Sequence, residues 1–222
     1  MESNRIPSGI QGIDQITEGG FMRGDMHILA GAPGTGKTIF ACTFANNAAT
    51  KLKEKVVYAS FEESSEYLKR NMKKLGIDLD GPEHSGALRL IDLDALKGRE
   101  LENNIQLLLS AVRETKSSVL IIDSLTALLL ATESKFELRT FMKGIYKTLK
   151  NEGVTTLMTL TQSEGEGFGI EGFVADSVML LENVMGPDQF KTRFIILKMR
   201  GTEHSKRYHA VMLSPTIGVS KF

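Results

Sequence analysis

The chain contains a single cysteine, Cys42, among its 222 residues. One thiol excludes an internal disulfide framework and any metal cluster built on cysteine ligands. The residues around it, Phe40, Ala41 and Phe44, are apolar. We therefore expect Cys42 to be a small buried side chain of the core and not a reactive thiol.

An excess of charge of one sign is also absent, because Lys and Arg number 27 and Asp and Glu number 27. This balance gives no overall attraction to nucleic acid or to an acidic membrane, although a local basic patch stays possible. The first residues, MESNRIPSG, lack the apolar core of a signal peptide. The most apolar stretch, 119–131, is short and interrupted by Asp123 and Ser124, so we expect no membrane span. A cytoplasmic location is the expectation that follows.

Internal repeats, low-complexity tracts and proline-rich linkers are missing as well. A length of 222 residues fits one large domain or at most two small ones, and we predict a single domain over 1–222. Apolar runs alternate with segments of helical periodicity, which predicts an α/β fold with a mostly parallel central sheet flanked by helices.

The expected elements follow from these runs. We predict parallel strands at 26–30, 56–61, 88–93, 119–122 and 154–160, the last being the final parallel strand. We predict helices at 37–53 and 64–75, and amphipathic helices around 101–112 and 138–149. Strands at 178–181, 193–199 and 208–213, joined by short turns, one of which carries Gly186-Pro187-Asp188, predict a C-terminal antiparallel extension at one sheet edge.

The segment GAPGTGKT, residues 31–38, matches the phosphate-binding loop G-x-x-x-x-G-K-[ST]. Triphosphate oxygens need many N–H donors at close range, and glycines allow the tight wrapping that brings the amides inward. The Lys37 ammonium can reach the β- and γ-phosphates, the Thr38 hydroxyl can bind Mg²⁺, and the helix that follows directs its positive end at the anion. The nucleotide-binding residues predicted here are Gly34, Thr35, Gly36, Lys37, Thr38 and Ile39.

Hydrolysis requires further groups, and acidic residues follow two of the predicted strands. Asp123 ends the run VLII, which is typical of a Walker B carboxylate that holds Mg²⁺; a turn-capping aspartate is the alternative. Glu62 and Glu63 follow the strand VVYASF at the edge where ligands of parallel sheets gather. One carboxylate can polarise the attacking water, with Glu62 favoured, and Glu63 can lie near magnesium. An acidic first helical turn is the alternative for this pair.

Two further groups are candidates for contact with the nucleotide. Thr161, Gln162 and Ser163 end the strand at 154–160, where a polar side chain such as Gln162 can sense the γ-phosphate, although a plain polar strand end fits nearly as well. Lys198 and Arg200 alternate within LKMRGT, which places both on one face of a strand. Two such cations usually form a solvated surface, but they can serve a neighbouring subunit, and an arginine supplied in trans accelerates GTP hydrolysis about 10³–10⁵-fold.

Five segments together resemble KaiC-like ATPases of the RecA superfamily. They are RIPSGIQGIDQITEGGFMRG at 5–24, GAPGTGKT at 31–38, FEES at 61–64, GIEGFVADSVMLL at 169–181 and LKMRGTEH at 197–204. The phosphate loop alone is shared by many families, whereas the paired glutamates, FVAD and K-M-R-G-T-x-H in combination are far more specific. The resemblance extends over about residues 5–218.

This resemblance implies a RecA-type core, Mg²⁺-ATP as ligand and a ring, usually a homohexamer, with ATP between subunits. It assigns Glu62 and Glu63 to the catalytic pair, with Glu62 as the base, and Thr38 to magnesium. The residues that it implies reach the nucleotide of the adjacent subunit are Lys198, Met199, Arg200, Thr202 and His204. Without the resemblance, His204 indicates only a surface or capping histidine.

The chain also departs from the clock proteins of this family. Those proteins carry two such domains, and their second domain has adjacent Ser and Thr phosphoacceptors where Gly172 and Phe173 align here. Neither residue can accept phosphate, and the sequence ends at Phe222 with almost no regulatory tail. These differences argue against self-phosphorylation at that place and against a role as a circadian oscillator.

The sequence therefore predicts an ATPase that hydrolyses Mg²⁺-ATP slowly at the subunit interfaces of a homo-oligomeric ring and acts as a switch for a protein partner. A DNA recombination or repair accessory protein is one alternative, but the loop SEGEGFGIEG at 163–172 has Glu164, Glu166 and Glu171, no Lys or Arg, and one aromatic residue, Phe168. The negative charge of this loop disfavours contact with the phosphates of nucleic acid. A non-hydrolysing ATP sensor that binds a protein is the other alternative.

Overall fold

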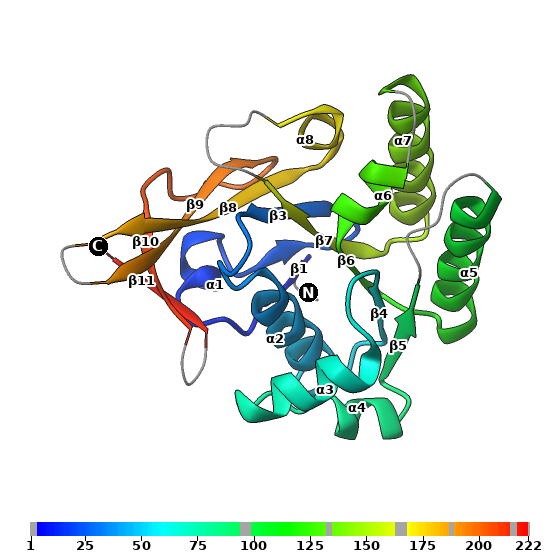
Figure 1. Cartoon of the computed structure of the whole chain (residues 1–222), viewed down its shortest axis with the longest axis horizontal. Helices are drawn as coiled ribbons and strands as arrows, with labels where there is room; N and C mark the ends of the chain where they lie inside the picture. Colours follow the sequence, from blue (N-terminus) through cyan, green and yellow to red (C-terminus); the bar gives the residue numbers. More distant parts are fainter. Residues whose placement is uncertain are drawn as a thin grey trace.

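The computed structural model of the chain describes residues 4–93, 99–131, 135–162, 168–186, 189–213 and 217–221. A nine-stranded sheet runs through the middle of the molecule (Figure 1). Its strands, in spatial order, are β11 (Gly218–Lys221), β10 (His209–Met212), β9 (Phe190–Met199), β8 (Ser177–Met185), β3 (Met26–Gly31), β7 (Thr155–Thr161), β6 (Val119–Asp123), β4 (Val56–Ser60) and β5 (Leu88–Asp92). A small second sheet pairs β1 (Arg5–Ile6) with β2 (Phe21–Met22).

Helices cover both faces of the large sheet, so two apolar clusters form the core. One cluster joins α2 (Lys37–Thr50) and α3 (Ser65–Lys74) to one face. The other joins α5 (Arg99–Thr115), α6 (Leu125–Ala131) and α7 (Lys135–Asn151) to the opposite face. The remaining helices are short: α1 (Ile13–Ile16), α4 (Asp80–His84) and α8 (Ile170–Val174). Burial on both faces explains why the central strands read as continuous apolar runs.

The predicted α/β architecture is confirmed, with a mostly parallel sheet, flanking helices and antiparallel strands β9, β10 and β11 at one edge. The predicted helices at 37–53, 64–75, 101–112 and 138–149 correspond to α2, α3, α5 and α7. The Ser64 side chain accepts a hydrogen bond from the Tyr67 amide and so caps α3 as predicted. Residues Pro187 and Asp188 of the predicted turn lie outside the described residues.

One prediction about strand direction is wrong. The strand at 154–160 is not the last parallel strand, because β8 pairs parallel with β3. Parallel pairing requires a crossover connection, and α8 lies between β7 and β8 in the chain, where such a connection is needed. Helix α6 and strand β11 were not predicted either. The periodicity of 119–131 is ambiguous because this apolar stretch contains a strand followed directly by a helix.

Strand register brings the ends of the parallel strands together at one edge of the sheet. Gly31 pairs with Thr161 between β3 and β7, and Ser60 pairs with Asp123 between β4 and β6. All four strands point in the same direction, so the residues at and just after these positions gather at a single edge. Ligands of α/β proteins bind at such an edge.

Candidate nucleotide-binding site

The phosphate loop joins the end of β3 to the start of α2, as predicted. Gly34 and Gly36 have φ angles of 79° and 94°, a backbone region that side chains rarely adopt. Gly31 is required for a different reason, because a Cβ atom there would lie 2.4 Å from the Leu181 carbonyl oxygen. The loop is thus shaped by conformational freedom at two glycines and by close packing at the third.

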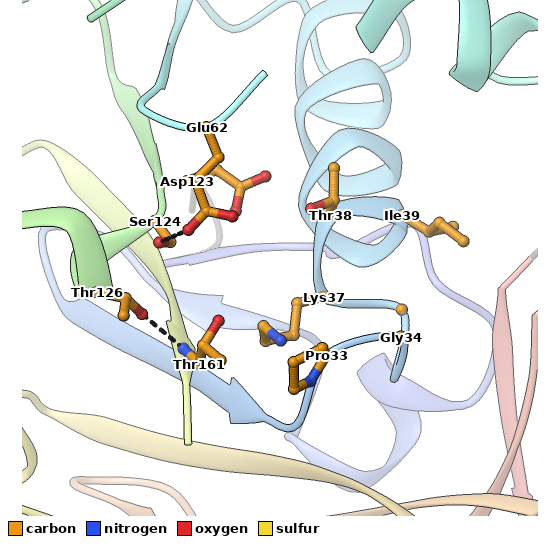
Figure 2. Close-up of a pocket in the computed structure, with 11 residues that line it drawn as sticks. Pro33, Gly34, Lys37, Thr38, Ile39, Glu62, Asp123, Ser124, Thr126 and Thr161 are labelled. Carbon is orange, nitrogen blue, oxygen red and sulfur yellow. Dashed lines mark hydrogen bonds between the residues drawn. The ribbon is translucent and has the colours of Figure 1, made fainter. Parts of the chain in front are cut away.

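A cavity of about 480 Å³ opens beside this loop (Figure 2). It is lined by Pro33, Gly34, Gly36, Lys37, Thr38, Ile39, Glu62, Asp123, Ser124, Thr126 and Thr161. Figure 2 shows the carboxyl groups of Glu62 and Asp123 on one side, across from Thr38 at the start of α2. Residues far apart in the sequence therefore meet in one cavity, and they include most of the phosphate loop and both favoured acidic residues.

Lys37 lies between the loop and these acids. Its ammonium group donates hydrogen bonds to the carbonyl oxygens of Gly31 at 2.8 Å and Ala32 at 3.0 Å. Burial lowers the pKa of Lys37, while the charges of Asp123 and Glu62 oppose that shift. The loop therefore holds the cation at the cavity, where the phosphate groups of a nucleotide would meet it.

Asp123 is held by two hydroxyl groups. Tyr58 donates to its Oδ2 atom at 2.7 Å, and Thr159 donates to its Oδ1 atom. The carboxylate lies in the same cavity as the Thr38 hydroxyl. No group of three or more His, Cys, Asp or Glu side chains able to hold a metal occurs among the described residues. A site with one carboxylate, one hydroxyl and room for phosphate oxygens suits Mg²⁺, which uses few protein ligands and keeps waters.

The two adjacent glutamates lie in different environments. Glu62 lines the cavity, and its Oε1 atom accepts a hydrogen bond of 2.5 Å from the Ser124 hydroxyl. Glu63 is not among the residues that line the cavity, although its backbone N–H and carbonyl are both bound to the Ser60 hydroxyl. Burial, together with the Asp123 and Glu62 carboxylates, raises the pKa of Glu63. The arrangement favours Glu62 for direct contact with a substrate.

Lys198 and Arg200 do not line this cavity. Both contact the C-terminal end of α8, although Arg200 is the first residue after β9 and so is not part of the strand on which both were expected. Lys198 donates to the carbonyl oxygens of Gly172 at 3.0 Å and Ala175 at 2.6 Å, and Arg200 donates to that of Phe173 at 3.1 Å. Burial and the nearby charge of Arg200 lower the pKa of Lys198.

Arg200 is also linked to a buried carboxylate. Its Nη1 atom lies 3.4 Å from Asp176, the aspartate of FVAD, which is almost fully buried and accepts hydrogen bonds from the Tyr146 hydroxyl and from the Met26 amide. This contact holds one end of the Arg200 guanidinium group in place, although the residue as a whole is exposed. Arg200 is therefore held by contacts within the chain and is still accessible to solvent.

The other residues predicted to reach a nucleotide lie in several places. Met199 is buried in the core, so its side chain is not presented to a molecule outside the chain. Thr202 accepts a hydrogen bond from Arg5, and the His204 ring contacts the Thr202 carbonyl. The backbone N–H of Gln162 donates to the Gly31 carbonyl beside the loop. Thr35 is fully buried and bonds back to Ala32, so it shapes the loop and does not line the cavity.

Several groups at the site were not predicted. Thr126 lines the cavity at the start of α6 and accepts a hydrogen bond from the Thr161 amide at 2.7 Å (Figure 2). Ser124 was considered only as part of a turn. Tyr58 and Thr159, which hold Asp123, lie inside strands, where no sequence signal separates them from ordinary core residues. Ser163, Glu164 and Glu166 of the acidic loop lie outside the described residues.

The fold and the cavity together define a P-loop nucleoside triphosphatase of the RecA type. A family sequence model described as "ATPase: KaiC" matches residues 6–220, and the chain belongs to this family. Its nucleotide-binding character follows from that membership.

Individual relatives agree with this assignment. The chain is 31% identical over 217 residues to the circadian clock oscillator protein KaiC of Parasynechococcus marenigrum. It is 31% identical over 214 residues to the circadian clock protein KaiC3 of a Synechocystis species. These alignments cover 93% and 91% of this chain but only 42% of each relative, so the chain spans less than half the length of these proteins.

A solved structure matches the whole fold. The crystal structure of a KaiC-like protein from the archaeon Pyrococcus horikoshii superimposes with a TM-score of 0.87 at 31% identity, covering 97% of this chain and 98% of that one. Among the helices that the structure describes, none has the length and apolar character to cross a membrane.

Proposed function

We propose that this protein is a Mg²⁺-dependent ATPase whose site is shared between protomers of a homo-oligomeric ring. It acts as a nucleotide-driven switch built from one domain over 1–222. One observation supports the shared site above all. Among the described residues that line the cavity, Lys37 is the single cation. During phosphoryl transfer the phosphate oxygens carry negative charge in the transition state, and a single lysine compensates it poorly. An arginine from a partner is a common second source of positive charge.

The chain's own residues can perform the remaining steps. The loop amides and Lys37 bind the phosphates, and Thr38 and Asp123 would hold magnesium, which supplies charge neutralisation on the phosphate oxygens when bound. Glu62 can orient and deprotonate the attacking water, with its position fixed by Ser124. Slow turnover is consistent with a site that is completed only when a neighbour docks.

Lys198 and Arg200 are the proposed cations from that neighbour. In this protomer they face the end of α8 and not the cavity, so a second copy that presents this face to the cavity would deliver them. The heterologous contact that results is of the kind that closes into a ring. ATP occupancy would then strengthen or weaken the contact between protomers, which gives a partner protein a nucleotide-dependent surface.

The experiment that tests this proposal combines phosphate release with native mass measurement, each with and without Mg²⁺-ATP. We expect steady phosphate release and an assembled species whose population depends on nucleotide. The Lys37→Ala variant should lose nucleotide binding, since removal of its charge-assisted hydrogen bonds alone costs about 1.5–3 kcal/mol, or roughly 10- to 150-fold in affinity.

Two results would contradict the proposal. Tight nucleotide binding without any phosphate release would indicate a non-hydrolysing sensor. Phosphate release by a species that stays monomeric in the presence of Mg²⁺-ATP would show that the site needs no neighbour.

A further inference from the structure

A chain of buried hydrogen bonds leads from the core to the Asp123 carboxylate. The Cys42 thiol of α2 donates to the Tyr58 hydroxyl at 3.5 Å, and Tyr58 donates in turn to Asp123 Oδ2 at 2.7 Å. The Thr159 hydroxyl donates to the other carboxylate oxygen, Oδ1. Cys42, Tyr58 and Thr159 are all 0% exposed. Two strands, β4 and β7, therefore supply donors to one side chain of β6 at the edge of the cavity, and α2 is linked to it through Tyr58.

Strand register explains why these groups meet. Ser60 pairs with Asp123, and Tyr58, two residues earlier on β4, points to the same face of the sheet. Ile121 and Leu157, two residues before Asp123 and Thr159, pack in the cluster on the α2 face. Thus all three polar side chains project to the face that α2 covers, the face on which Lys37 and Thr38 lie.

The direction of each hydrogen bond is fixed by chemistry. An ionised carboxylate only accepts, so both hydroxyl groups must donate to Asp123. Burial and the Asp123 charge raise the pKa of Tyr58, so this hydroxyl keeps its proton. Each carboxylate oxygen has a further lone pair, which leaves both oxygens able to accept from metal-bound water in the cavity. The two hydroxyls thus fix the plane of the carboxylate without filling its outer side.

We propose that Tyr58 and Thr159 are positioning residues that hold Asp123 in the orientation required to bind the magnesium of a Mg²⁺-nucleotide. This inference rests on the proposed function, because it assigns Asp123 to magnesium. It adds two residues that never touch the nucleotide and that act only through the orientation of a neighbouring carboxylate. Partners that orient metal ligands in this way commonly contribute 10- to 100-fold to metal affinity.

Near-isosteric variants test this role with a readout separate from turnover. Tyr58→Phe and Thr159→Val each remove one hydroxyl and keep the shape of the side chain. The probe is Mn²⁺, followed by its EPR signal, titrated into protein saturated with ADP. We expect each variant to bind Mn²⁺ about 10-fold more weakly than the unaltered protein. The affinity for fluorescent N-methylanthraniloyl-ADP in EDTA should not change, because the loop contacts are intact.

Two controls separate orientation from stability. Thr155→Val removes a hydroxyl that accepts from the Gly24 amide at the opposite end of β7. It should lower the melting temperature but leave Mn²⁺ affinity unchanged. Thr159→Ser keeps a donor at the critical position and should retain the affinity that Thr159→Val loses.

The outcomes distinguish this inference from the proposed function. Unchanged Mn²⁺ affinity in folded Tyr58→Phe and Thr159→Val proteins, when the unaltered protein binds Mn²⁺-ADP, would overturn the inference alone. An equal loss of Mn²⁺ affinity in Thr155→Val would also overturn it, because the effect would then reflect strand stability. Absence of Mn²⁺-ADP binding by the unaltered protein would overturn the proposed function and the inference with it.

Discussion

At the scale of single residues, the two adjacent glutamates show how position decides chemistry. Both carboxylates follow β4, yet only Glu62 lines the cavity and accepts a hydrogen bond from Ser124. Glu63 has a raised pKa because it is partly desolvated beside two other carboxylates, but its carboxylate is not part of the cavity wall. The same side-chain type thus has a direct role at one position and, at the next, an influence through charge.

We expect Glu62→Gln to keep nucleotide binding and to lower the rate of phosphate release by about 10²–10⁴-fold, the usual contribution of a general base. Glu63→Gln should cause a smaller loss. Glu66→Gln, in the exposed first turn of α3, is a charge-matched control that should release phosphate at the normal rate. Equal rates for Glu62→Gln and the control would remove Glu62 as the base.

At the scale of elements, α8 is a very short helix held to β9 by side chains. A helix of one turn leaves its carbonyl groups without partners of its own. Here Lys198 and Arg200 supply donors to the carbonyls of Gly172, Phe173 and Ala175, close to the negative end of the helix. Any movement of these cations toward a neighbouring nucleotide would therefore release α8, so this contact couples the two elements.

The Lys198→Met variant should show faster amide hydrogen exchange in residues 168–176, because the carbonyl groups of α8 lose their principal donor. The cost in global stability should be modest, about 1–3 kcal/mol for hydrogen bonds to a charged group. Lys191→Met, at an exposed position of the same strand, is the matched control. Mass spectrometry of exchanged peptides measures both. Unchanged exchange in α8 would mean that its packing against α7, and not Lys198, holds it.

At the scale of the whole molecule, the site of a protomer holds an anion-binding loop and acids, whereas the pair Lys198 and Arg200 faces outward beside α8. These two surfaces are formed by different segments of the sequence and lie on different strands of one sheet (Figure 1). A head-to-tail contact between copies would bring them together without any rearrangement of the core.

Mixing two inactive variants tests this arrangement directly. Glu62→Gln protomers lack the base but present Arg200, and Arg200→Ala protomers lack the cation but keep the base. In random mixed assemblies, roughly a quarter of the interfaces would combine an intact base with an intact arginine. We therefore expect phosphate release to recover on mixing and to fall again on dilution. Activity of the mixture equal to the mean of its separate components would contradict a shared site.

Much of this protein was predictable from its sequence. The phosphate loop follows from backbone chemistry at Gly34 and Gly36, where only glycine adopts the required angles easily. The buried strands and amphipathic helices follow from periodicity, and Asp123 from its place at the end of an apolar run. These features are local, so a short stretch of sequence contains all the information that determines them.

Other features depended on contacts between distant segments. The sequence does not reveal that β8 runs parallel to β3. The direction of a strand depends on whether the connection before it crosses back to the end of the sheet where the preceding strand began. Nor does the sequence show that Tyr58 and Thr159 bind Asp123, since these contacts depend on register across three strands. Local sequence determined which groups are available for chemistry, and the tertiary structure decided which of them meet, because hydrogen bonds and charges act only at contact distance.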